Sequence, residues 1–381
     1  MEGQHLLGKI GPIARLPVAP GDQARTYLKG VLDELGCPYE SVPFSSVLRL
    51  PVAWRVQVQD LTPGSGWCTV PSAAAVGSPT CREVEGRVTS AGTGAPMEYQ
   101  LGGESYRGSI VLAALGALPS RQIIYTARDH GAVAALLYHP RASSVRAVAP
   151  DARLPLPAAT ISRETANVLT RMARRARLEV DSEERDLPFE NIFVRRGEGP
   201  LHIVVIGHYD SRPLRLGPGG RSLSLAVMLS LLATVRPPAD RRLTLAFLDG
   251  EEVGSVGSAR YYDDVQAEAM EPPDLVVDLN ALGTRRDLGM EVRHPHGDGS
   301  GLKELAVRTF QAADLSVTSR GVDRSFYGGR PIPGVRWPVV VLGGRPRRRV
   351  PSWDPGQGMP DRWGVSRLIG PITTLLCEAK G

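Results

Sequence analysis

The chain has 381 residues, of which 42% are hydrophobic and 22% charged, and its formal net charge is +5. This length suffices for more than one domain, and the balance is that of a globular protein. No apolar run is long enough to span a membrane, and the arginine clusters lack the interleaved aromatic residues and motifs of nucleic-acid binders, so neither function is expected. The N-terminus lacks a basic segment followed by an apolar one, which predicts a cytoplasmic protein, or a secreted one if the N-terminus was trimmed.

The first half of the chain predicts a helix, a strand and a β-rich module. Apolar residues recur at helical spacing over 23–35, and Gly36 supplies a stop. Residues 48–58 alternate as in a strand. From about 61 to 177 the chain is rich in Gly, Pro and Ser, which with its short apolar runs indicates a compact module with its own core. Its signals are a strand at 106–113, a helix leading into a strand at 127–138, a strand at 156–162 and a helix at 163–175.

From residue 177 onward, strands and helices alternate. The predicted strands are 177–182, 190–195, 201–206, 243–248, 274–280 and 338–342, and the predicted helices are 222–235, 255–269, 302–313 and 362–379. Such alternation is typical of an α/β/α sandwich, with helices on both faces of the sheet. We therefore expect a main domain formed by residues 1–60 and 178–381, with the module 61–177 inserted into it.

Polar residues gather at the ends of the predicted strands, where open α/β sheets place their functional crevice. His208 follows one strand, Glu251 and Glu252 follow the next, and Asn280 ends a third. A hydrolytic metal site needs nitrogen and carboxylate ligands, a free carboxylate as general base, and partners that fix the histidine tautomer. In that scheme His208 and Glu252 are ligands, Glu251 is the base, and Asp210 is the partner of His208.

The stretches Gly207-His208-Tyr209-Asp210-Ser211 and 247–258, with the entry strand 191–194, resemble the co-catalytic di-zinc aminopeptidases. That family includes bacterial leucyl aminopeptidases, glutamate carboxypeptidase II and the transferrin receptor. The resemblance implies a zinc-exopeptidase-like sandwich with a mixed sheet. It also identifies the module 61–177 as similar to the protease-associated domain that many members carry.

The resemblance assigns five ligand positions, and this sequence departs from the family at three of them. His208 matches the first ligand, Glu251 the general base and Glu252 a zinc ligand. Gly220 stands where the family has an Asp that bridges the two ions, and Asn280 replaces a further Asp. The last family ligand is a C-terminal His, but no histidine follows His296. In the family, His208 and Glu252 serve different ions, so each zinc would keep one side-chain ligand, where about three are needed.

Arginines surround these replaced positions in the sequence. Arg221 follows Gly220, and Arg324 lies where relatives often have Asp-His or a similar pair. We hypothesise that one of these guanidinium groups fills the metal space and neutralises Glu251 and Glu252, which otherwise repel each other. An alternative metal site at His294 and His296 would lie in a loop that the family does not use for ligands.

Three functional hypotheses follow. The favoured one is a non-catalytic homologue without a cofactor, which acts as a scaffold, as a subunit of a homo- or hetero-oligomer, or as a peptide- or anion-binding protein. The second is an active metallo-aminopeptidase that holds zinc through unorthodox ligands. The third is a metal-free reaction that uses Glu251, His208 and Asp210.

Overall fold

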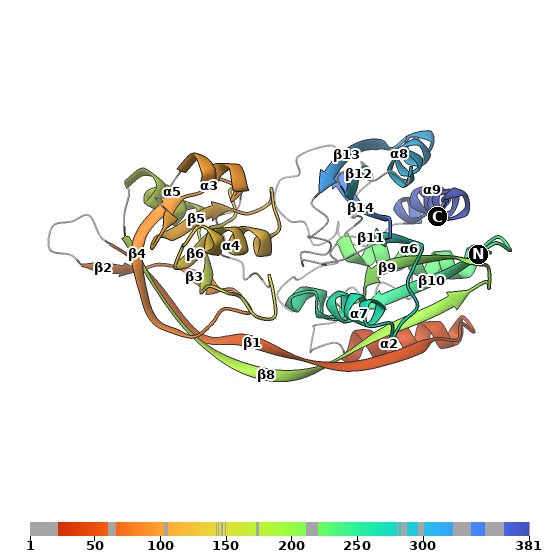
Figure 1. The fold of residues 1–381 in the computed structure, drawn as a ribbon, viewed down its shortest axis with the longest axis horizontal. Helices are drawn as coiled ribbons and strands as arrows, with labels where there is room; N and C mark the ends of the chain where they lie inside the picture. The colour runs from red at the N-terminus through yellow and green to blue at the C-terminus, as the bar shows by residue number, and fades with distance from the viewer. Residues whose placement is uncertain are drawn as a thin grey trace. The chain divides into compact units, whose positions relative to one another are not determined.

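A computed structural model describes most of the chain, which falls into two compact units. The described residues are 22–59, 66–102, 106–141, 143, 145, 148, 150–172, 175–210, 220–279, 282, 288–295, 301–322, 337–346 and 362–380. Unit 1 comprises Met1–Phe44, Phe189–Glu252 and Gly257–Gly381, and unit 2 comprises Ser45–Pro188 and Val253–Val256 (Figure 1). Within the described residues, no helix is both long and apolar enough to cross a bilayer.

Unit 1 is built on a mixed sheet with the strand order β13-β12-β14-β11-β9-β10-β8. Its strands are β8 (Arg175–Arg196), β9 (Leu201–His208), β10 (Arg241–Leu248), β11 (Leu275–Leu279), β12 (Leu288–Pro295), β13 (Ser316–Val322) and β14 (Val339–Pro346). The four central strands are parallel, whereas β8 and β12 run antiparallel to β10 and β14. His208 pairs with Leu248 in the β9–β10 register, so both strands end at the same edge of the sheet.

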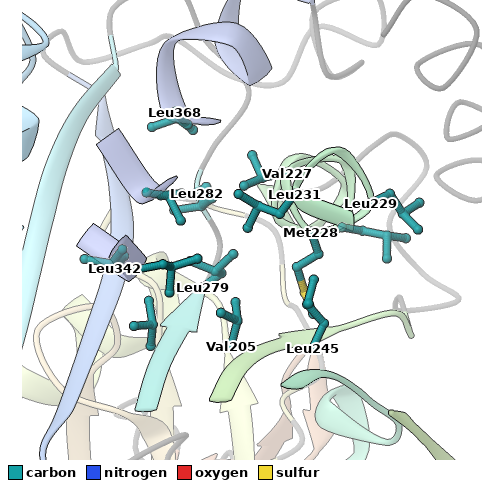
Figure 2. Close-up of a cluster of buried hydrophobic side chains, with 14 of the residues drawn as sticks. Val205, Val227, Met228, Leu229, Leu231, Leu245, Leu279, Leu282, Leu342 and Leu368 are labelled. Carbon is teal, nitrogen blue, oxygen red and sulfur yellow. The ribbon is translucent and has the colours of Figure 1, made fainter. Parts of the chain in front are cut away.

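Helices cover both faces of this sheet, as predicted. They are α2 (Asp22–Glu34), α6 (Gly220–Thr234), α7 (Val256–Gln266), α8 (Leu302–Ala312) and α9 (Arg362–Glu378). Leucine-rich faces of α2, α6, α8 and α9 share one buried cluster with alternate residues of the central strands. Figure 2 shows this cluster around α6. The other face packs against α7 through Tyr261, Tyr262 and Val265.

Gly207 lets α6 approach the strand that leads to the site. A Cβ atom at this position would lie 2.2 Å from the Met228 sulfur, which points from α6 toward the sheet in Figure 2. Real Cβ contacts are essentially never that short, so a larger residue would force the Met228 side chain to move. The glycine before His208 therefore makes room for that side chain.

Unit 2 has its own sheet, in which β8 also takes part, with the order β8-β4-β5-β6-β7-β3. Its other strands are β1 (Glu40–Gln59), β2 (Trp67–Thr69), β3 (Ser72–Ala74), β4 (Cys81–Ser90), β5 (Ile110–Ala114), β6 (Ala134–Tyr138) and β7 (Ala158–Ile161). Its helices are α3 (Pro96–Gly102), α4 (Ser120–Asp129) and α5 (Arg163–Met172). Residues of α5 join one buried cluster, and residues of α3 and α4 join a second.

From residue 177 onward, the strand pattern differs from the prediction in two places. The predicted strands 177–182 and 190–195 are parts of the single strand β8, because the charged stretch between them is held in the strand by pairing with β1 and by ion pairs. Glu184 binds Arg49 at 2.9 Å and Arg153 at 3.1 Å. The strands β12 and β13 were not predicted, because glycine, arginine and histidine dilute their alternation of apolar residues.

His202 at the start of β9 gives unit 1 a pH dependence. Its Nε2 lies 2.8 Å from Thr244 Oγ1, and its Nδ1 lies 3.3 Å from the Pro272 carbonyl. Burial lowers the pKa of His202 below 6.5, although the Pro272 hydrogen bond opposes this. The folded chain therefore holds a neutral imidazole, whose contribution is complete above about pH 6.5 and is lost as the pH falls through the folded pKa.

We expect the wild-type protein to lose up to about 1.4 kcal/mol more stability than a His202→Asn variant when the pH falls from about 7.5 to about 5.5. Arg242 lowers the same pKa, whereas Glu271 and Asp274 raise it, so the comparison is best made at fixed ionic strength. Urea unfolding at both pH values measures the difference. Equal pH dependence of the two proteins would contradict the assignment.

Candidate functional site

The site lies at the edge of the unit 1 sheet where β9 and β10 end. His208 is the last residue of β9. Glu251 begins the short helix η2 (Glu251–Val253), three residues after β10 ends at Leu248. The His208 Nε2 atom lies 3.7 Å from Glu251 Oε2, and both side chains are at least nine-tenths buried. Two residues from separate motifs therefore meet in a site shielded from water, where their interaction is stronger than at the surface.

The loop that carries Glu251 is closed at its base by Asn191 of β8. The Asn191 Oδ1 accepts a hydrogen bond from the Asp249 amide at 3.1 Å, and the Asn191 Nδ2 donates to the Gly257 carbonyl at 2.9 Å. The Gly257 amide donates to the Asp249 carbonyl at 2.9 Å. These three bonds join the two ends of the loop 249–257 to each other and to the sheet.

Asp249 is the buried acid at the entry of this loop. Its carboxylate accepts hydrogen bonds from the Gly250 amide at 2.8 Å and from the Glu190 amide at 3.2 Å, and the Tyr209 hydroxyl lies beside it. Burial raises the pKa of Asp249, although these polar neighbours oppose that change. Burial likewise raises the pKa of Tyr209, so its phenol stays neutral. The Tyr209 hydroxyl donates to the Glu190 carbonyl at 2.7 Å, which ties the residue after His208 to β8.

Two cations of α2 anchor the strand segment beneath the site. The Lys29 Nζ lies 2.6 Å from Glu190 Oε1, and the Arg25 Nη1 lies 3.3 Å from Glu190 Oε2. Burial alone would raise the pKa of Glu190, but bonds from Lys29, Ser41 and Arg25 outweigh it and hold the pKa below its usual value. The carboxylate is thus ionised and fixed, and the backbone that leads to Asn191 is fixed with it.

The structure describes the other predicted site residues only in part. Asp210 is buried, with 6% of its surface exposed, two residues after His208. Gly220 is the first residue of α6, and Glu252 lies in η2, but the side chains of Glu252 and Arg221 are not among those described. Asn280 and Arg324 lie outside the described residues, as does His296, and their predicted roles stay predictions.

Sequence reasoning gave no role to Asn191, Asp249 or Tyr209, which organise the backbone around His208 and Glu251. All three stood inside the motifs that signal the family resemblance. Their presence within those motifs was a usable signal, because a polar residue at the end of a buried strand must find hydrogen-bond partners. The identity of those partners is a tertiary property that motif spacing does not carry.

The described donors do not fit a zinc ion. Among the side chains that the structure describes, no group of three or more His, Cys, Asp or Glu is arranged to hold a metal. His208 with Glu251 supplies two donors, and Glu251 is at the position of the general base, whereas a catalytic zinc takes about three protein ligands. We derive no reaction step through zinc.

Comparison with known proteins agrees with the fold and the motifs. The sequence profile of Peptidase family M28 matches residues 191–327. Aminopeptidase YwaD of Bacillus subtilis (strain 168) is 23% identical over 193 residues, which are 49% of this chain and 42% of that protein. The chain therefore matches less than half the length of this curated relative.

Solved structures of two aminopeptidases share the fold over nearly the whole chain. An aminopeptidase from Aneurinibacillus sp. strain AM-1 has a TM-score of 0.63 and 16% identity, over 98% of this chain and 92% of the other. BSAP, a zinc aminopeptidase from Bacillus subtilis, has a TM-score of 0.61 and 17% identity, over 98% and 94%. The mixed α/β fold resembling the zinc aminopeptidases is thereby confirmed.

Proposed function

Since residues 191–327 match the model of Peptidase family M28, we propose that the chain is a non-catalytic homologue of the zinc aminopeptidases. It would act as a scaffold, as a partner subunit, or as a protein that binds a peptide or an anion. The observation that carries this proposal is the composition of the ligand positions: Gly220, Asn280 and a C-terminal stretch without histidine. A glycine offers no ligand at all, and an asparagine offers only a neutral amide.

His208 and Glu251 also lie close enough to interact directly. The His208 Nε2 lies 3.7 Å from the carboxylate at the base position. If the imidazole is protonated, the two side chains form an ion pair that needs no metal between them. Arg221 and Arg324 are the proposed further partners of the Glu251–Glu252 pair. An experimental structure with no arginine nitrogen near these carboxylates would exclude that part of the proposal.

We propose that unit 2 is a protease-associated domain and that its surface binds a protein partner. Its support is the predicted module at 61–177 together with its own sheet and two buried clusters. We also propose that the protein is cytoplasmic and that its partner is a protein or a peptide. Copurification of a defined partner with the tagged full chain is the corresponding measurement.

The competing function is an active metallo-aminopeptidase with unorthodox ligands. Two observations favour it: Glu251 and His208 are retained and buried together, and similar proteins are named aminopeptidases. In that case His208 and Glu252 would belong to the ligand set of bound zinc, which supplies Lewis-acid chemistry, and Glu251 would be the general base.

Zinc content and turnover separate the two functions. We expect the purified full chain to retain far less than one zinc per molecule and to show no turnover of aminoacyl chromogenic substrates, with or without added zinc or cobalt. The Glu251→Gln variant should then match wild type in zinc content and in its lack of turnover. Near-stoichiometric zinc, with turnover that Glu251→Gln abolishes while Asp129→Asn on the exposed surface leaves it intact, would establish the competing function instead.

A further inference from the structure

The loop 249–257, which carries Glu251 opposite His208, contains three residues in the left-handed backbone conformation. Gly250, Gly254 and Ser255 have φ angles of 67°, 104° and 56°. The left-handed region is accessible to glycine, but it is strained for Ser255. Such a backbone persists only when the surrounding structure over-determines it. Gly254 packs closely against the backbone of Asp151 and Ala152, and other groups act at the two ends of the loop, where it joins β10 and α7.

Asn191 is the side chain that acts at both ends. It accepts from the Asp249 amide and donates to the Gly257 carbonyl, eight residues further along. Only a primary amide offers an acceptor and a donor on one short, planar group, so a carboxylate or an apolar side chain cannot make both bonds. Asn191 is 1% exposed, which removes water as a substitute partner.

We propose that Asn191 is a positioning residue that closes the loop 249–257 and thereby holds Glu251 against His208 without a metal ion. The inference rests on the proposed function, because it takes the His208–Glu251 contact as the arrangement of a site that holds no zinc. Asp249 adds to the closure by binding the Glu190 amide on the same strand. Asn191 itself touches neither His208 nor Glu251 in the described contacts, and it acts through the loop.

The test combines hydrogen exchange with nuclear magnetic resonance on the full chain. We expect Asn191→Ala to speed amide exchange over residues 249–257 by about tenfold to hundredfold, as the loss of two buried hydrogen bonds implies. The same variant should move the His208 imidazole resonances in the direction that Glu251→Gln moves them. Asn167→Ala, at an exposed position of α5, is the matched control and should change neither signal.

Asn191→Asp is the second variant, for the case that the alanine variant does not fold. It keeps the acceptor for the Asp249 amide but sets an oxygen against the Gly257 carbonyl, so a change of the same kind is expected. Unchanged His208 resonances, or exchange that rises evenly over unit 1, would show a purely structural role and overturn the proposal. Zinc content and turnover are measured separately, so an active enzyme could still contain the clamp, and an inactive homologue could lack it.

Discussion

A Gly257→Ala substitution should destabilise unit 1 by about 3–5 kcal/mol, combining over-packing with the loss of buried hydrogen bonds. A Cβ atom on Gly257 would lie 2.2 Å from the Asp249 carbonyl oxygen, 2.6 Å from Asn191 Oδ1 and 2.7 Å from the Asp249 amide nitrogen. Two of these atoms belong to the backbone and cannot rotate away. The methyl group would therefore separate the two ends of the loop or displace α7.

Gly30→Ala is the matched control for this substitution. Gly30 also lies in a helix of unit 1, α2, but a Cβ atom there would have no atom within 4 Å. Alanine should stabilise the exposed helix by about 0.5–1 kcal/mol, because it loses less backbone entropy on folding. Urea denaturation followed by circular dichroism measures both variants. A Gly257→Ala protein as stable as wild type would show that the loop closure is not tightly packed.

The local elements of unit 1 could be predicted because their signals lie within a few residues of each other. The helix α2 ends where Gly36, with a φ of 60°, provides the left-handed stop that the sequence suggests. A general rule for parallel strands predicts that His208 and Glu251 lie at one sheet edge, and in the structure their side chains lie 3.7 Å apart. The spacing of apolar residues, the glycine stop and the positions of strand ends were sufficient for these conclusions.

The remaining features depend on partners that are distant in the sequence. Asn191 is 66 residues from Gly257 and 58 from Asp249, so no local pattern reveals that it closes their loop. The same holds for Glu190, whose cationic partners Arg25 and Lys29 lie more than 160 residues away. In the case of β8, ion pairs and strand pairing extend a stretch whose composition is typical of a loop.

Restoring two carboxylates tests whether Gly220 and Asn280 limit the affinity of the site for zinc. We expect the double variant Gly220→Asp and Asn280→Asp to bind zinc on the order of 100-fold more tightly than wild type, because His208 would gain the two anionic ligands that a three-ligand site requires. Gly220 begins α6, and Asn280 directly follows β11, the strand hydrogen-bonded to the strand of His208. Isothermal titration calorimetry with zinc measures the change.

The increase in zinc affinity should depend on His208 and on where the new carboxylates lie. Adding His208→Gln to the double variant should abolish it, since a carboxylate pair without the imidazole is left with two ligands. Asn167→Asp adds one carboxylate to an exposed face of α5 and should leave zinc affinity at the wild-type level. Turnover is not expected to return, because the second ion would still lack the C-terminal histidine that the family supplies. If the double variant binds zinc no better than wild type, the site has been rebuilt around other partners, and restoring ligands cannot reverse it. If wild type already binds as tightly as the double variant, Gly220 and Asn280 are not vacated ligand positions, and the active enzyme becomes the better explanation of the retained Glu251.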